Sequence, residues 1–160
     1  MKKNNSLSPI RSSGNHKKYK PKKGLHTHSH YEILLILKAG GTHTVETEVC
    51  PVLDNQVFFL KPGQYHFFQP SKAAEFLFLA IDSEILSNYT SLYLRDFEFF
   101  QNISSFNYIR DPDLADLQPI FNEIQFELDH KQFNQDIVVS SLITTLLVKL
   151  QRCYLKHHPS

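Results

Sequence analysis

The stretch HTHSHYEILLILKAGG, residues 26–41, decides the fold. It opens with four polar side chains at alternate positions: His26, His28, His30 and Glu32. Alternate positions share one face of an extended strand, so these side chains would form one cluster. The run 33–37 is continuous Ile and Leu, which is typical of a strand buried on both faces. Gly40 and Gly41 then supply the positive φ of a tight hairpin. The stretch therefore predicts a β-structure with a polar cluster at its mouth or in its interior.

Length and composition indicate a single globular domain. The chain has 160 residues, of which 41% are hydrophobic, enough for a sizeable core. Its two cysteines, Cys50 and Cys153, lie far apart and form no CxxC pair, which argues against a disulfide framework or a redox motif. No segment approaches the roughly 20 apolar residues of a membrane span, and the N-terminus lacks the apolar core of a signal peptide. We therefore expect a cytoplasmic protein without a membrane partner.

Charge divides the sequence into a basic arm and an acidic remainder. Residues 1–23 carry eight Lys or Arg and no acidic residue, whereas the remainder carries nine basic and sixteen acidic residues. A basic arm of this kind can contact nucleic acid or a partner. No apolar periodicity organises it, however, so we interpret it as a disordered, solvated tail.

Short apolar segments follow the arm at the spacing of an antiparallel β-structure. Five of them are expected to be strands: Tyr31–Lys38, Thr42–Val49, Gln56–Lys61, Tyr65–Gln69 and Glu75–Ile81. Turn residues separate them, including the pair Pro62-Gly63. This rhythm predicts a small antiparallel sandwich or barrel over residues 24–82.

The hydrophobic period changes from about 2 to about 3.6 residues after Asp82. Helices are therefore expected over three ranges: 83–92, 116–129 and 136–155. Pro119 is tolerated only in the first turn of the middle helix, which favours Asp116 as its N-cap. The Phe-rich residues 95–110 receive no assignment.

An apolar seam runs along the middle helix. Its members recur at spacings of three and four residues: Leu114, Leu117, Phe121, Ile124 and Leu128. This is the period of a helix–helix seam. The final helix is apolar over more than one face, so the helical pair has spare apolar surface. Packing onto the β-structure and self-association are both open, and we expect a dimer through the seam.

His26, His28 and Glu32 supply two imidazoles and a carboxylate, a set that suits zinc, nickel, manganese or ferrous iron. His66 follows the Pro62-Gly63 turn on a strand that could face the first. Together they would form an open site with room for water or substrate. The alternative is a hydrogen-bonded polar network that lines a ligand pocket without a metal.

Three further residues are candidate ligand contacts. Phe59 and Phe68 belong to strands with alternating Phe residues, some of which would face the interior. There they would stack on a sugar or an aromatic acid, or simply form the core. His43 begins another expected strand and would either face the ligand or face solvent.

Residues 24–68 resemble the cupin module at the N-terminus of AraC/XylS-family transcriptional regulators. The general cupin pattern begins with HxH, three residues and Glu, and His26, His28 and Glu32 fit that spacing. The second cupin motif ends in a Pro/Gly turn, two residues and His, which Pro62-Gly63-Gln64-Tyr65-His66 matches. The surrounding stretch VFFLKPGQYH is particularly like the regulator branch.

The resemblance implies a cupin-type antiparallel β-barrel, or double-stranded β-helix, over residues 24–82 and a helical dimerisation segment over residues 83–160. The ranges 114–128 and 139–155 are similar to the paired dimerisation helices of such regulators. DNA would be bound only through a helix-turn-helix domain beyond Ser160. The chain is then a non-enzymatic domain that binds a small-molecule effector and forms a homodimer.

The resemblance also gathers the candidate site residues. Those expected to bind the effector are His26, His28, Glu32, His43, His66, Phe59 and Phe68. Four of them are the expected ligands of a possible divalent metal (Zn, Ni, Mn or Fe): His26, His28, Glu32 and His66. The alternative function is a small metal-dependent cupin enzyme of the oxygenase, isomerase or lyase type.

Overall fold

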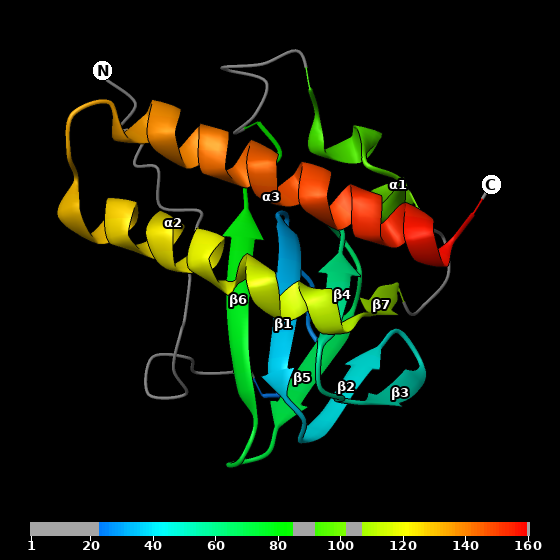
Figure 1. Ribbon diagram of the computed structural model, residues 1–160. Coiled ribbons are helices and arrows are strands. Elements are labelled where there is room, and N and C mark those ends of the chain that lie inside the picture. Colours follow the sequence, from blue (N-terminus) through cyan, green and yellow to red (C-terminus); the bar gives the residue numbers. More distant parts are fainter. Residues whose placement is uncertain (1–22, 85–91, 102–106, 160) are drawn as a thin grey trace, which may run out of the picture.

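The computed structural model describes residues 23–84, 92–101 and 107–159 as two antiparallel sheets and a layer of helices (Figure 1). The strands are β1 (Tyr31–Lys38), β2 (Gly41–Val45), β3 (Glu48–Pro51), β4 (Gln56–Leu60), β5 (His66–Pro70), β6 (Glu75–Ile81) and β7 (Tyr108–Arg110). The helices are η1 (Leu94–Asp96), α1 (Glu98–Gln101), η2 (Pro112–Leu117), α2 (Gln118–His130) and α3 (Gln135–His157), where η marks a 3₁₀-helix. Residues 1–22 of the basic arm and 85–91 of the helix expected over 83–92 lie outside the described residues.

The larger sheet has the order β6-β1-β4-β7 and the smaller sheet the order β3-β2-β5. Every paired strand is antiparallel. Between the described strands no hydrogen-bonded ladder closes the two sheets into one barrel. The expected fold class, antiparallel β-structure followed by C-terminal helices, is confirmed.

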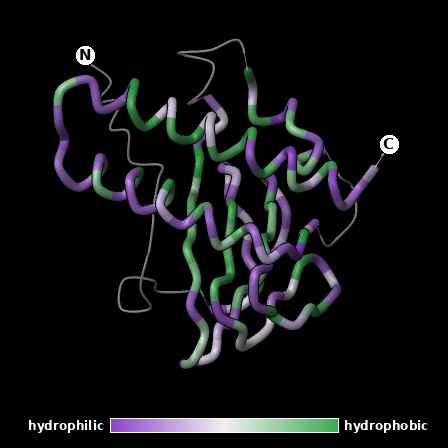
Figure 2. The backbone as a smooth tube through the Cα atoms, in the orientation of Figure 1, coloured by the Kyte–Doolittle hydropathy of each residue, from purple (hydrophilic) through white to green (hydrophobic). Residues whose placement is uncertain are grey.

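β1 is buried on both faces, which explains its unbroken apolar sequence. Ile33 and Leu35 belong to a core shared with the helices, whereas Leu34 and Ile36 belong to a second core shared with the smaller sheet. All four side chains are at most 2% exposed, and Figure 2 shows the apolar residues concentrated along the strands of the larger sheet. Even-numbered positions of β1 therefore face the smaller sheet. Glu32 is one of them.

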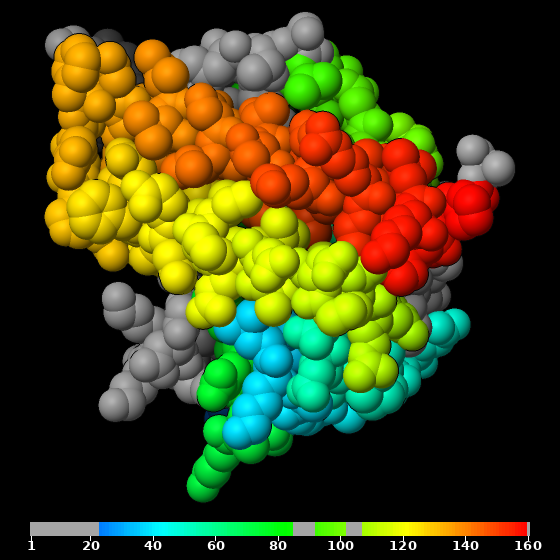
Figure 3. All heavy atoms as spheres, viewed as in Figure 1, coloured from blue at the N-terminus to red at the C-terminus, as the bar shows by residue number. Residues whose placement is uncertain are grey.

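α2 and α3 lie side by side over the outer face of the larger sheet (Figures 1 and 3). The seam residues lie inside this packing. The members at most 7% exposed are Leu114, Leu117, Phe121 and Ile124, and Leu128 packs against the same core. These side chains are used within the chain, which corrects the prediction that they face a partner. A stripe at three- and four-residue spacing fits a sheet as well as it fits another helix.

The β-structure differs from the prediction in two ways: one expected strand is divided in two, and one further strand is present. The strand expected over Thr42–Val49 is two strands, because Glu46 adopts a φ of 54° in the turn between β2 and β3. The unassigned residues 95–110 contain α1 and β7, and β7 adds an edge to the larger sheet beside β4.

The start of the helical hairpin also differs from the prediction. α2 begins at Gln118, directly after η2, and Pro119 lies in its first turn as expected. The cap of the preceding η2 is Asp111, whose side chain accepts a hydrogen bond from Asp113 N at 2.9 Å. Asp116, the expected cap, lies inside η2. The capping carboxylate is therefore that of Asp111 at the start of η2, and the N-terminus of α2 has no side-chain cap.

α3 is the one helix in the described part of the chain that is long and apolar enough to cross a membrane, by length and composition alone. It is also a core helix, since Ile143, Leu146 and Leu147 are fully buried. The core helix of a soluble protein passes the same test.

Candidate functional site

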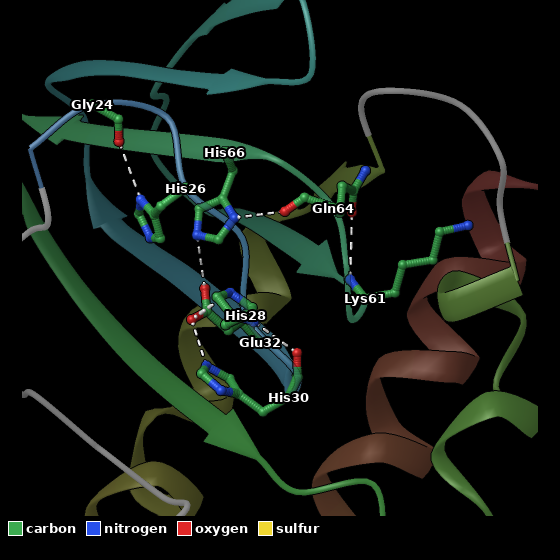
Figure 4. A network of polar contacts seen from close by, with 8 residues as sticks. All are labelled: Gly24, His26, His28, His30, Glu32, Lys61, Gln64 and His66. Carbon is green, nitrogen blue, oxygen red and sulfur yellow. Dashed lines mark hydrogen bonds and ion pairs between the residues drawn. The ribbon is translucent and has the colours of Figure 1, made fainter.

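Two separate motifs of the sequence meet in the structure (Figure 4). His26 and His66 exchange backbone hydrogen bonds with N···O distances of 3.1 and 2.9 Å, so the segment before β1 runs beside the start of β5. Gly63 N donates to His28 O at 2.9 Å, which ties the turn before β5 to the same segment. The φ of 80° at Gly63 is one that a side chain would strain. These backbone hydrogen bonds place the histidines of both motifs next to Glu32 on β1.

The Glu32 carboxylate is the centre of the cluster. Its Oε1 lies 2.8 Å from His28 Nε2 and 2.9 Å from His30 Nε2, and its Oε2 lies 3.3 Å from His66 Nε2. The side chains of Glu32, His28 and His66 are at most 8% exposed, whereas that of His30 is 33% exposed. Despite this short distance, His28 Nε2 makes no hydrogen bond with the described residues.

The opposite ring nitrogens fix the orientation of the histidines. His28 Nδ1 donates to His30 O at 2.9 Å and His66 Nδ1 donates to Gln64 O at 3.2 Å, because a carbonyl oxygen can only accept. In a neutral imidazole, Nε2 is then an unprotonated lone pair. Two such lone pairs would repel the carboxylate unless the imidazoles are protonated or a cation lies between them. Nδ1–H bonds to carbonyls are also what orients histidines in metal centres.

The pKa of Glu32 reflects these contacts. Burial alone would raise the pKa, but the contacts with His28, His30 and His66 outweigh it and hold the pKa well below its usual range. The cluster therefore holds an ionised carboxylate at neutral pH.

The ligand atoms of His28, Glu32 and His66 all lie within 4.8 Å of one another, which is close enough for one metal ion. His26, the fourth predicted ligand, is not in this set. Its Nδ1 lies 3.1 Å from Gly24 O, although its ring centroid is only 4.5 Å from that of His66. His30 was expected in the polar cluster but not among the effector or metal ligands, and its ring stacks on that of His28 with a centroid distance of 3.8 Å. The alternation that it shares with the other three polar residues was the signal for it.

His43 lies deeper in the interior between the sheets. Its side chain is 0% exposed, and neither ring nitrogen has a hydrogen-bond partner in the described part of the chain. Its ring centroid lies 4.6 Å from Phe58, 5.6 Å from Phe68 and 5.8 Å from His66. Burial, with a smaller contribution from the charge of His66, lowers the pKa of His43 to about 3. His43 is therefore a neutral imidazole with an unused donor and an unused acceptor.

The two predicted phenylalanines lie on different sides of the larger sheet. Phe68 on β5 belongs to the core between the sheets, beside His43. Phe59 on β4 belongs to the core under the helices and stacks on Phe99 at 4.2 Å. This corrects the prediction that Phe59 shares the histidine site. The β1–β4 register pairs Glu32 with Leu60, so Phe59 points the other way.

Comparison with known proteins gives one family and one fold. A family model described as the AraC-like ligand binding domain matches residues 16–147. No curated protein matches the chain.

Three examples represent the solved structures that are similar to the chain. The first is ToxT K231A from Vibrio cholerae, with a TM-score of 0.52 and 13% identity over 91% of this chain and 56% of that chain. The second is the AraC-like transcriptional activator CuxR, with a TM-score of 0.48 and 11% identity over 76% of this chain and 43% of that chain. The third is a cupin protein from Bacteroides fragilis, with a TM-score of 0.37 and 20% identity over 51% of this chain and 69% of that chain. The chain thus spans about half the length of the first two.

Proposed function

Because the chain belongs to the family of AraC-like ligand-binding domains, we propose that it is the effector-binding domain of a cytoplasmic transcriptional regulator. A small molecule binds at the cluster around Glu32, and the bound state controls a helix-turn-helix DNA-binding domain attached after α3. The domain itself is not an enzyme in this proposal.

The observation that carries the proposal is the buried polar centre of the two sheets. Glu32, His66 and His43 are 6%, 3% and 0% exposed. Taking such groups out of water is costly, and an apolar core would be cheaper for folding alone. Buried titratable groups gathered in this way favour a binding role. The free donor and acceptor of His43 suit an effector that carries hydroxyl or carboxylate groups.

The donor set also fits a divalent cation. His28, Glu32 and His66 are ligand types of zinc, nickel, manganese and iron, and their ligand atoms are already close together. Donation from Nδ1 to a carbonyl leaves Nε2 of both histidines for the metal. Such a cation would supply open coordination positions for an oxygen atom of the effector. His26 stands beside His66 as a possible fourth ligand.

Native mass spectrometry of the chain purified from its own host tests the proposal. We expect a small-molecule or metal adduct on the wild-type chain and its loss from the Glu32→Gln variant. His130→Gln is the matched control, because His130 is exposed on α2 and contacts Phe126 O. The proposal fails if the wild type carries no adduct that Glu32→Gln lacks, and if Mn²⁺, Zn²⁺ and a metabolite extract of the host raise the melting temperatures of the two proteins equally. Consumption of the adduct by the metal-loaded chain would favour the metal-dependent enzyme instead.

The proposed homodimer uses exposed apolar surface of the helical pair instead of the buried seam. Four large apolar side chains at the α2–α3 end are 36% to 90% exposed: Phe126, Phe133, Ile137 and Val138. They follow one another from the last turns of α2 through the connection to the first turn of α3. Clustered apolar side chains in solvent are typical of an association surface, and the self-complementary partner is a second copy of the chain.

A further inference from the structure

A second group of metal-ligating side chains lies at the opposite end of the chain from the histidine motif. Cys153 and His157 are four residues apart on α3, so they lie on one face of that helix. Asp111 follows β7 directly and faces them from the start of η2. The carboxylate oxygen, the sulfur and the imidazole nitrogen all lie within 4.8 Å of one another.

Asp111 is held rigidly, and its charge is already engaged. Its side chain is 2% exposed, and Oδ1 accepts a hydrogen bond from Asp113 N at 2.9 Å. Its backbone N donates to Asn55 O at 3.0 Å. Oδ2 lies 2.8 Å from both Lys156 Nζ and His157 Nε2. The Lys156 ammonium, the Asp113 backbone N–H and His157 hold the pKa of Asp111 well below its usual range.

We propose that Asp111, Cys153 and His157 form a second cation site, which takes a thiophilic divalent metal such as Zn²⁺ in place of the Lys156 ammonium. A carboxylate, a thiolate and an imidazole are a ligand set that zinc accepts, and three protein ligands leave a fourth position for water. Lys156 would compete with the metal for the Asp111 carboxylate, but its side chain is 61% exposed and therefore weakly held. It can move into solvent while a cation takes over its charge. This site is independent of the proposed effector site.

The charges and protons of the exchange balance. Burial, and then the negative charge of Asp111, raise the pKa of Cys153 to about 11, so the sulfur carries a proton before the metal arrives. Binding forms the metal–sulfur bond and releases that proton to solvent, while the Lys156 ammonium leaves with its charge. His157 Nε2 donates to Asp111 Oδ2 before the metal arrives, so the neutral ring passes this proton through solvent to Nδ1 and binds the metal through Nε2 without a change of charge. The metal brings two positive charges to a place that loses one cation and one proton. The net charge around Asp111 therefore stays the same.

A metal at this site would attach the last turns of α3 to the larger sheet. Asp111 is one residue beyond β7, and β7 pairs with β4 in the larger sheet. A metal shared by Asp111, Cys153 and His157 would fix the end of α3 to that sheet more firmly than the exposed Lys156 does. In the proposed regulator this end of α3 precedes the attached DNA-binding domain.

Co²⁺ titration of the full chain, stripped of metal with a chelator, tests the site. Thiolate ligation of Co²⁺ gives a sulfur-to-metal charge-transfer absorption in the near ultraviolet, and the histidine cluster around Glu32 has no sulfur ligand to produce one. We expect a saturating absorption with the intensity of one thiolate-bound Co²⁺ per chain, and its disappearance in Cys153→Ser. The final intensity should be the same in Cys50→Ser and in Glu32→Gln, and in Glu32→Gln, which lacks the carboxylate of the other cation site, it should be reached at one added Co²⁺ per chain. Persistence in Cys153→Ser would overturn the proposal, as would absence from the wild type.

Variants of Lys156 separate the site from a general folding defect. Lys156→Ala removes the competing ammonium, so we expect it to bind Co²⁺ severalfold more tightly than the wild type. Lys156→Arg keeps the charge and should bind as the wild type does. His157→Ala should weaken binding at least tenfold. A Lys156→Ala variant that binds no more tightly than Lys156→Arg would show that Lys156 and the metal do not compete, and the proposal would be wrong.

Discussion

Glu32 Oε2 lies 3.3 Å from His66 Nε2, and this contact joins the central part of the larger sheet to the first residue of β5 in the smaller one. Both side chains are buried, so the contact spans the interior that the two sheets enclose. The backbone bonds between His26 and His66 run beside it. A ligand at this point would therefore contact both sheets, and its binding would be linked to how they pack.

Replacing Glu32 by Gln should lower the free energy of unfolding by roughly 1–3 kcal/mol at pH 6. With the imidazoles protonated, both carboxylate oxygens accept from Nε2–H groups, whereas an amide offers one acceptor and turns a donor toward the other imidazolium. Urea unfolding followed by circular dichroism measures the change. Glu123→Gln, at an exposed position of α2, should leave the stability within about 0.5 kcal/mol of the wild type. Equal effects of the two substitutions would contradict a structural role for the Glu32 contacts.

The Glu32 contacts should make the chain acid-sensitive. The folded pKa of Glu32 lies below its unfolded value of 4.5, so the folded state binds the proton less readily than the unfolded state. The resulting stabilisation is fully present above pH 4.5 and is lost as the pH falls below that value. Unfolding free energies at pH 6 and pH 3.5 should differ more for the wild type than for Glu32→Gln. If the unfolding free energies of the two proteins depend on pH in the same way, Glu32 does not contribute to the acid sensitivity.

His43 should also weaken the fold in acid, although its pKa is lowered mainly by burial and not by hydrogen bonds with the other histidines. Its folded pKa of about 3 lies below the unfolded value of 6.5, so the unfolded state takes up a proton that the folded state refuses. Stability therefore falls between pH 6.5 and pH 3. His43→Leu removes this loss, and at pH 7 it should match or exceed the wild type by about 1 kcal/mol, because no hydrogen bond is broken. The same variant should lose the proposed effector adduct. A strong destabilisation at pH 7 would show that His43 has a partner after all.

The buried seam should behave as core. Ile124 is 0% exposed, so Ile124→Ala should cost about 2–5 kcal/mol of unfolding free energy, and Ile124→Glu should prevent folding. Thermal unfolding and near-ultraviolet circular dichroism measure both. A folded, soluble Ile124→Glu monomer would restore the interpretation of the seam as a dimer contact.

The sequence predicted those features of the fold and of the site that depend on a local pattern of residues. Alternation and turn residues located β1, β4, β5 and β6, and the two histidine motifs located the cluster around Glu32. The features that it did not predict depend on how strands pair or on which element a helix packs against. The turn at Glu46 interrupts an alternation that continues through it, without a glycine to mark it. The orientation of Phe59 follows from the register between β1 and β4, which no single segment contains. The spacing of the seam could not distinguish a sheet from a second helix.

Dimerisation should depend on the exposed end of the helical pair. Phe133 is 90% exposed in the connection between α2 and α3, and Ile137 is 50% exposed one turn later. Burying one such side chain contributes roughly 1.5–3 kcal/mol, and a two-fold dimer buries it twice. Phe133→Glu should therefore weaken dimerisation at least tenfold while the fold is kept, because 90% of the Phe133 side chain is in solvent in the single chain. Sedimentation velocity over a micromolar concentration series measures the dissociation constant. Gln132→Glu is the control, since it adds the same charge at the neighbouring exposed position and should leave the dimer intact. A wild-type chain that sediments as a monomer throughout the series would exclude this surface as a dimer contact.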